Sequence, residues 1–66
     1  MKSILITGVL GGMGKETALH FLNLGYRVIG LDNKDYTELP IDYYQVDLTK
    51  ISEIERGIRI LYTLGF

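Results

Sequence analysis

The stretch "ITGVLGGMGKET", residues 6–17, holds four glycines within seven positions, at Gly8, Gly11, Gly12 and Gly14. It follows an apolar run and leads into a segment with helical periodicity. Glycine lowers the stability of strands and helices, so its repeated use indicates a backbone that turns tightly or approaches another group closely. The amides of a first helical turn lack internal partners and lie at the positive end of the helix dipole. A glycine-rich turn from strand to helix therefore favours a bound anion such as pyrophosphate; the alternative is a tight turn without a ligand.

The segments around these glycines predict alternating strands and a helix. Three short β-rich runs predict strands at Lys2–Thr7, Tyr26–Leu31 and Asp42–Val46. A helix is predicted over 14–24 and ends at Gly25 in the C′ position, with an apolar face formed by Ala18, Phe21 and Leu22. Strand, helix and strand in this order form a βαβ unit, whose crossover is right-handed in nearly all proteins. Residues 33–41 have room for a loop or one turn, but not for a second crossover helix.

The C-terminal segment predicts a second helix. Its apolar residues recur at spacings of three and four, as in an amphipathic helix; they are Ile51, Ile54, Ile58 and Leu61. Ser52 and Glu55 fit a capping box, and Thr49 is a competing N-cap. Leu64-Gly65-Phe66 resembles a helix end with glycine at C′.

Length and composition limit the classes of function. A chain of 66 residues forms one small domain, and a core of this size buries only about 60% of the unfolded surface. The chain has no cysteine, which excludes a disulfide framework and a cysteine-based metal site. A net charge of −1 argues against nucleic acid and a polybasic membrane patch. No segment reaches the ~20 apolar residues that span a bilayer. We therefore expect a cytoplasmic chain.

The glycine stretch resembles the cofactor fingerprint of the short-chain dehydrogenase/reductase family. Residues 7–14, "TGVLGGMG", match its T-G-x-x-x-G-x-G form and also T-G-x-x-G-x-x-G, the form typical of the extended, sugar-epimerase-like branch. The resemblance implies an α/β fold of the Rossmann type, here partial: a three-stranded parallel sheet, order 3-2-1, with two helices. Residues 1–66 would then be a single truncated dinucleotide-binding domain. In such a turn one glycine permits the tight turn, a second lets the pyrophosphate approach the backbone, and a third lets the helix pack closely on the strand. Gly8, Gly12 and Gly14 are expected to have these three roles in that order.

Two further positions support the resemblance. Asp32 follows Gly14 by 18 residues, close to the spacing of the acid that accepts hydrogen bonds from the adenosine ribose. A carboxylate there repels a 2′-phosphate and favours NAD over NADP, although Lys34 weakens that choice; the alternative is a solvated aspartate at a strand end. In "VDLT", residues 46–49, Asp47 and Leu48 resemble the family's adenine-contacting pair, while Asp47 equally suits the start of a helix. The predicted cofactor-binding residues are Gly8, Gly11, Gly12, Met13, Gly14, Asp32, Asp47 and Leu48.

The family's catalytic residues have no counterpart in this sequence. Hydride transfer in the family relies on a tyrosine four residues before a lysine, and none of the five tyrosines has lysine at that distance. The resemblance covers essentially all of this chain but only about the first quarter of a typical member. We therefore expect an NAD(P)-binding N-terminal portion of a short-chain dehydrogenase/reductase-like oxidoreductase that is inactive alone, with no catalytic residue and no metal site. The alternative is a non-enzymatic module that associates with itself or a partner.

The same resemblance predicts a homodimer. The strand at Lys2–Thr7 would leave one edge unpaired, and the last helix would leave Ile60, Leu64 and Phe66 without neighbours. A core this small rarely supplies more than about 3–5 kcal/mol, so both surfaces are expected to be covered by a second copy. A dimer formed by pairing the Lys2–Thr7 strands of two copies is slightly favoured over one formed by packing their C-terminal helices together.

Overall fold

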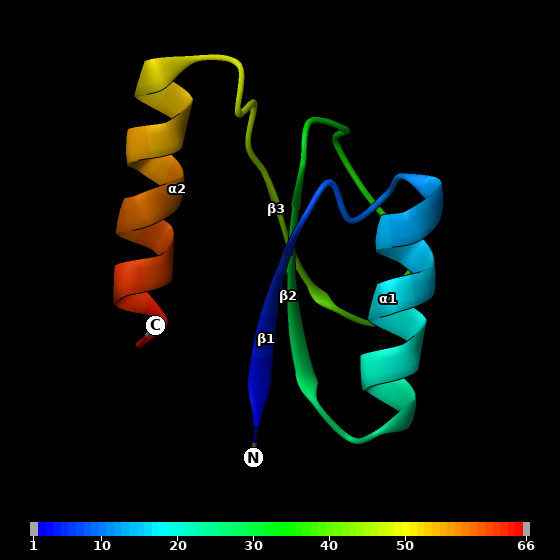
Figure 1. Cartoon of the computed structure of the whole chain (residues 1–66). Helices are drawn as coiled ribbons and strands as arrows, with labels where there is room; N and C mark the ends of the chain where they lie inside the picture. Colours follow the sequence, from blue (N-terminus) through cyan, green and yellow to red (C-terminus); the bar gives the residue numbers. More distant parts are fainter. Residues whose placement is uncertain (1, 66) are drawn as a thin grey trace.

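A computed structural model describes residues 2–65 as three strands and two helices (Figure 1). In chain order the elements are β1 (Ser3–Thr7), α1 (Gly12–Asn23), β2 (Arg27–Asp32), β3 (Asp42–Gln45) and α2 (Ile51–Thr63). The strands form one parallel sheet in the order β1-β2-β3. Read from its other edge this is the order 3-2-1, so the predicted partial Rossmann fold is confirmed.

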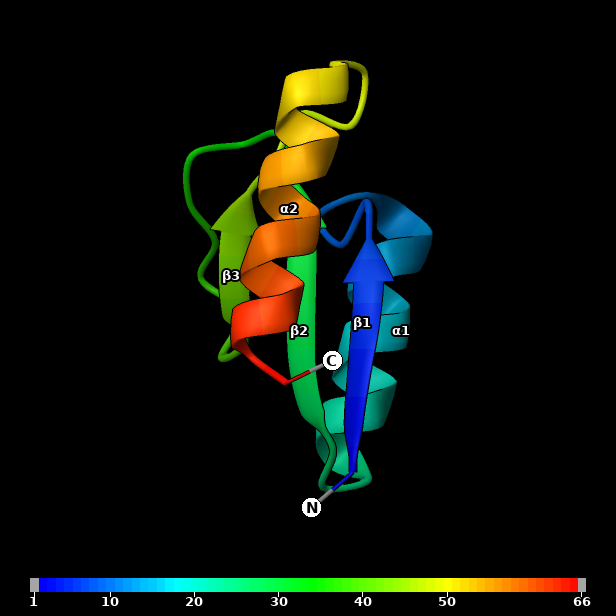
Figure 2. The same ribbon diagram turned by 90° about the vertical axis from the view of Figure 1, so that its left-hand side faces the viewer.

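The sheet lies between the two helices, with α1 on one face and α2 on the other (Figures 1 and 2). Ile6 pairs with Gly30, and Gly30 pairs with Tyr43, so the three strands end at nearly the same level. Because the strands are parallel, their carboxyl ends lie along one edge of the sheet. The turn before α1 and the turn before α2 therefore both start from that edge.

The core lies mainly on the α1 face of the sheet. Four buried residues form its centre, and they are Ile6, Val9, Ala18 and Val28. Leu39 and Ile41 of the segment between β2 and β3 pack against them, so this segment covers the sheet where a crossover helix would otherwise lie. Gly30 is required by this packing, since a Cβ there would lie 2.7 Å from Ile41 Cδ1.

The opposite face is covered by α2 in an orientation that the apolar spacing does not predict. Ile29, Leu31 and Val46 are buried, and α2 approaches them through buried Gly57, where a Cβ would lie 3.4 Å from Val46 Cγ1. Three residues of the predicted apolar row are exposed instead, and the fourth, Leu61, is half-buried. The exposed fractions are 77% for Ile51, 37% for Ile54 and 60% for Ile58.

The residues expected to lose their neighbours at the end of α2 are partly covered. Ile60 and Leu64 are half-buried and line a groove of about 350 Å³ with Tyr44 of β3, so the prediction that they are exposed is wrong. Phe66, the third residue of that prediction, lies outside the described residues. Among residues 2–65 no helix has the length and apolar character needed to cross a membrane.

Element boundaries agree with the predictions to within two residues, but one cap is wrong. Helix α1 starts at Gly12 rather than Gly14, and Gly25 follows its end with φ +84°, as predicted for a C′ glycine. Helix α2 has Lys50 as its N-cap, without a side-chain cap hydrogen bond. Neither the predicted Ser52 capping box nor Thr49 fills that position, because the Thr49 hydroxyl donates to Asp47 Oδ1 instead.

Candidate functional site

The glycine turn is folded back on itself between β1 and α1. Gly8 adopts φ +64°, a left-handed conformation that favours glycine, and its carbonyl accepts a hydrogen bond from the Gly11 amide at 3.1 Å. A Cβ at Gly14 would lie 2.2 Å from that same Gly8 oxygen and 2.8 Å from Val9 Cα. Gly8 and Gly14 are therefore required by the turn itself, whether or not a ligand binds.

Gly12 differs from these two glycines because nothing surrounds it. A Cβ there would meet no atom within 4 Å, so its small size is not explained by packing inside the chain. Gly12 begins α1, whose N-cap, Gly11, offers no side-chain cap and whose first turn contains no acid. The amides of Gly12, Met13 and Gly14 precede the first amide bonded back to the cap, Lys15 N–H to Gly11 O at 2.9 Å. The Met13 side chain is 87% exposed, so its contribution here is its backbone amide.

Helix α2 also lacks a side-chain cap, but its first turn differs from that of α1 because it contains an acid. Its first turn contains Glu53, whose carboxylate occupies the positive end of the helix dipole. An anion is therefore favoured at α1 and disfavoured at α2.

Asp32 connects the end of β2 to the glycine turn. Its Oδ2 accepts a hydrogen bond from the Leu10 amide at 2.9 Å, and its Oδ1 accepts one from the Asn33 amide at 2.7 Å. A carboxylate has about four acceptor positions, so the side chain retains capacity for a ligand hydroxyl. The side chain is thus held at the edge of the turn rather than extending freely into solvent.

The carboxyl ends of the three strands enclose a small crevice of about 180 Å³. Its lining comes from Gly8 after β1, from Asp32 and Asn33 at the end of β2, and from residues 46–49 after β3. Ligands of open parallel α/β sheets bind at this end of the strands. The structure therefore brings together four of the eight predicted residues, namely Gly8, Asp32, Asp47 and Leu48, while Gly11, Gly12, Met13 and Gly14 form the adjoining start of α1.

A larger cavity, of about 510 Å³, is lined by Leu10 of the turn, by Lys15 of α1 and by residues of the segment between β2 and β3. These residues are Lys34, Tyr36, Thr37, Glu38 and Leu39. The cavity contains none of the eight predicted residues, so we place the candidate site in the smaller crevice.

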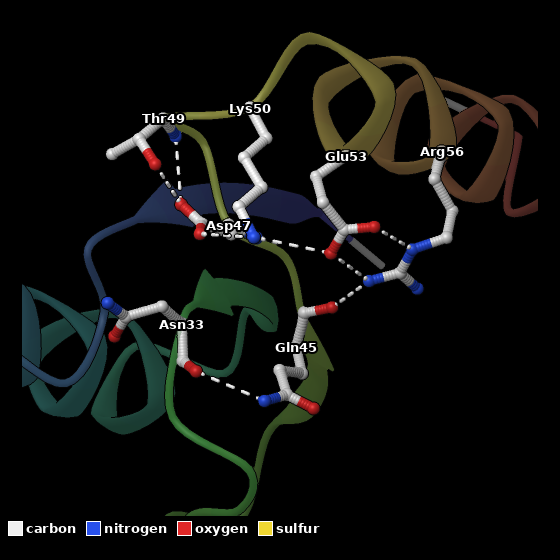
Figure 3. Close-up of polar contacts among 7 residues, drawn as sticks. All are labelled: Asn33, Gln45, Asp47, Thr49, Lys50, Glu53 and Arg56. Atoms are coloured by element: carbon white, nitrogen blue, oxygen red, sulfur yellow. Dashed lines mark hydrogen bonds and ion pairs between the residues drawn. The ribbon is translucent and has the colours of Figure 1, made fainter.

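Asp47 is held in the crevice by its neighbours along the chain (Figure 3). Its Oδ1 accepts hydrogen bonds from the Thr49 hydroxyl at 2.6 Å and from the Thr49 amide at 3.0 Å. The Thr49 hydroxyl contributes most to lowering the pKa of Asp47 below its ordinary value. These bonds form an Asx turn before Lys50, the N-cap of α2, rather than a cap of the helix, and the side chain remains a charged acceptor.

Sequence reasoning missed two residues beside Asp47. Glu53 and Arg56 of α2 form an ion pair, with Arg56 Nε 2.9 Å from Glu53 Oε2, and Glu53 Oε1 accepts a long hydrogen bond from the Asp47 amide at 3.4 Å. Their i,i+3 spacing on a helix was the available signal. It is a weak signal, because most such pairs are solvated.

Comparison with known proteins agrees with this geometry. The NAD dependent epimerase/dehydratase family matches residues 4–62, which include the glycine turn, Asp32 and the segment after β3. The chain belongs to this family. The narrower assignment to the short-chain dehydrogenases/reductases is not decided by this match, and no solved structure matches the chain significantly.

Two curated relatives are similar to parts of the chain. An uncharacterized oxidoreductase of Schizosaccharomyces pombe is 38% identical over 65 residues, which are 94% of this chain and 25% of that protein. UDP-glucose 4-epimerase 1 of Oryza sativa subsp. japonica is 49% identical over 35 residues, 53% of this chain and 10% of that protein. The chain therefore spans about a quarter or less of the length of these relatives.

Proposed function

We propose that this chain binds the adenosine–pyrophosphate part of NAD as the N-terminal cofactor-binding portion of a short-chain dehydrogenase/reductase-like enzyme. The observation that carries the proposal is the crevice at the strand ends, where Gly8, Asp32, Asp47 and Leu48 meet beside the uncapped start of α1. An adenine dinucleotide requires an anion site, an acceptor for its ribose hydroxyls and an apolar contact for its base, for which Leu48 is the candidate.

Each part of the nucleotide has a matching group. The amides of Gly12, Met13 and Gly14 would bind pyrophosphate, and the open space at Gly12 would let it approach the backbone. Asp32 would accept hydrogen bonds from the ribose hydroxyls. Asp47 and Leu48 would contact adenine. The nicotinamide of a bound dinucleotide would supply the hydride acceptor or donor. Residues 1–66 contain no tyrosine–lysine pair that could act as the proton donor for that hydride transfer.

We further propose that NAD is preferred over NADP. The Asp32 carboxylate lies where the ribose would bind, and it would repel a 2′-phosphate. Lys15 and Lys34 line the larger cavity outside the turn and would reduce this repulsion without removing it.

Between the two forms of the glycine fingerprint, we favour the sugar-epimerase-like one. Family membership and the partial similarity to a UDP-glucose 4-epimerase support this choice. The reaction of a complete enzyme would then be NAD-dependent oxidoreduction or epimerisation, carried out together with residues that this sequence does not contain.

An NMR titration of the full chain with NAD and ADP tests the proposal. We expect both ligands to shift the amide signals of residues 8–14, Asp32 and Asp47, and the variant Gly12→Val to abolish these shifts. Ser52→Val is the matched control, since it places the same β-branched residue on an exposed site in the first turn of α2. NAD binding by Gly12→Val with the affinity of the parent chain would show that pyrophosphate does not bind there.

Self-association is a second candidate function. Among the described residues β1 pairs only with β2, and the α2 row of Ile51, Ile58 and Tyr62 is at least 60% exposed. A homodimer would cover the strand edge by joining two β1 strands antiparallel, or would cover the helix row. Sedimentation velocity without nucleotide tests it, and a folded monomer at high micromolar concentration would refute it.

A further inference from the structure

Glu53 and Arg56 contact the backbone of Asp47 and of Gln45, the last residue of β3 (Figure 3). The Arg56 Nη2 group donates to the Gln45 carbonyl, and Glu53 Oε1 accepts from the Asp47 amide at 3.4 Å. The two side chains are joined by two hydrogen bonds of 2.9 Å, from Arg56 Nε and Nη2 to the two carboxylate oxygens. One ion pair on α2 thus bridges two backbone groups that flank a single buried residue.

This bridge adds to the sheet hydrogen bonds at the same place. The Val46 amide donates to the Asp32 carbonyl at 2.8 Å, which fixes the strand end against β2. After Val46 the chain leaves the sheet, and Asp47 and Leu48 have no strand partner. The amide of Asp47 is therefore held by Glu53 rather than by the sheet.

Glu53 and Arg56 are both charged at neutral pH, which favours the bridge between them. The hydrogen bond from Arg56 contributes most to lowering the pKa of Glu53, so the carboxylate is ionised. The side chains of Glu53 and Arg56 are 29% and 42% exposed, so solvent screens the attraction only in part. Two parallel hydrogen bonds also fix the relative orientation of the two groups.

We propose that Glu53 and Arg56 are positioning residues for the adenine subsite. They touch no part of the nucleotide; they hold Asp47 and Leu48 at the crevice so that both meet the same adenine ring. The inference rests on the proposed nucleotide site and adds the residues that set its geometry.

Affinity for two simple ligands tests the proposal. Pyrophosphate reports the glycine turn alone, and AMP also reports the adenine subsite. For Arg56→Met, which keeps most of the side-chain stem, we expect AMP affinity to fall about five- to tenfold, the effect of losing about one ordinary hydrogen bond. Pyrophosphate affinity should stay within twofold of the parent chain, about the resolution of such a titration. Arg56→Lys should restore part of the loss, and Arg59→Met, an exposed arginine on the same helix, should bind both ligands as the parent does.

Amide hydrogen exchange provides a test without a ligand. In Arg56→Met and in Glu53→Gln the Asp47 amide should exchange faster than in the parent, while the Val46 amide, bonded within the sheet, should keep its protection. Glu53→Gln keeps the size of the side chain, so it replaces Arg56→Met if that variant does not fold.

The outcomes separate this proposal from the proposed function. Unchanged AMP affinity in both variants, or an equal fall for AMP and pyrophosphate, would overturn the positioning role. A parent chain that binds pyrophosphate but not AMP would refute the adenine subsite itself. A parent chain that binds neither ligand would refute the whole nucleotide site.

Discussion

Replacement of Gly14 by alanine should destabilise the chain although it improves helix propensity. Alanine in place of glycine in a helix gains about 1 kcal/mol. Against this, the new Cβ would lie 2.2 Å from Gly8 O and 2.8 Å from Val9 Cα, where ordinary contact begins near 3.4 Å. Both obstacles are backbone atoms and cannot rotate away, so α1 must move off the turn. Such overpacking costs about 1–3 kcal/mol or more, and the large overlap places Gly14 at the upper end.

The expected net loss is about 2 kcal/mol in the free energy of unfolding, roughly half of what a core of this size supplies. Urea unfolding followed by circular dichroism measures it. Gly12→Ala is the matched control, because it lies two residues earlier in the same helix and its Cβ would enter open space. We expect Gly12→Ala to be as stable as the parent or slightly more stable. Equal stability of Gly14→Ala and the parent chain would refute the reasoning from packing.

Three further predictions concern the nucleotide and pH. At equal ionic strength NAD should bind more tightly than NADP, and Asp32→Asn should narrow the difference in a calorimetric titration; tighter binding of NADP by the parent would contradict the role of the carboxylate. The purified chain should show no turnover with alcohols or sugar nucleotides above buffer background in a spectrophotometric NADH assay, because it lacks the tyrosine–lysine pair. Asp47 and Glu53 have lowered pKa values in the folded chain. Their contribution to stability is therefore complete at a pH above their ordinary pKa values of 3.8 and 4.5, and it is lost as the pH falls through their lowered pKa values. Acid unfolding monitored by circular dichroism should therefore depend less steeply on pH below 4.5 in Glu53→Gln.

The strands could be predicted because each is a short apolar or β-rich run between turn residues, which is local information. Their parallel pairing and order are not local, and they were predicted from the family resemblance of the glycine turn. Gly25 at the end of α1 was equally predictable, because its φ of +84° is a conformation that side chains rarely allow.

The orientation of α2 could not be predicted from apolar spacing. The spacing places Ile51, Ile54 and Ile58 on one side, yet the helix approaches the sheet through Gly57, which permits close contact with Val46. The Arg56–Gln45 and Glu53–Asp47 hydrogen bonds fix the same orientation. A small residue and an ion pair thus contribute to the orientation of the helix together with half-buried Ile60, Leu61 and Leu64, and the spacing of apolar residues predicts neither of the first two contributions.

Sequence spacing predicted that Gly8, Asp32, Asp47 and Leu48 would lie together at the strand ends, but it did not predict their contacts. The spacing of Asp32 from the glycines indicated a ribose acceptor, but not that its carboxylate already accepts the amide of Leu10. That bond depends on how the turn folds back toward β2, which sequence separation does not describe. The bond to Leu10 makes Asp32 part of the glycine turn as well as a candidate residue for binding the ribose.

Nucleotide binding at the proposed crevice would be coupled to folding. The walls of the crevice come from the ends of three strands, so the crevice exists only when all three are paired. A ligand that binds only the folded state adds about 2.7 kcal/mol of stability at a free concentration one hundred times its Kd. The seven apolar residues that are buried among residues 2–65 form a core whose stability is of the same order, about 3–5 kcal/mol. Saturating NAD should therefore raise the thermal midpoint of the parent chain strongly and leave that of Gly12→Val nearly unchanged. A ligand-independent midpoint in the parent would mean that the crevice does not bind the nucleotide, because stabilisation by a ligand selective for the folded state cannot be avoided.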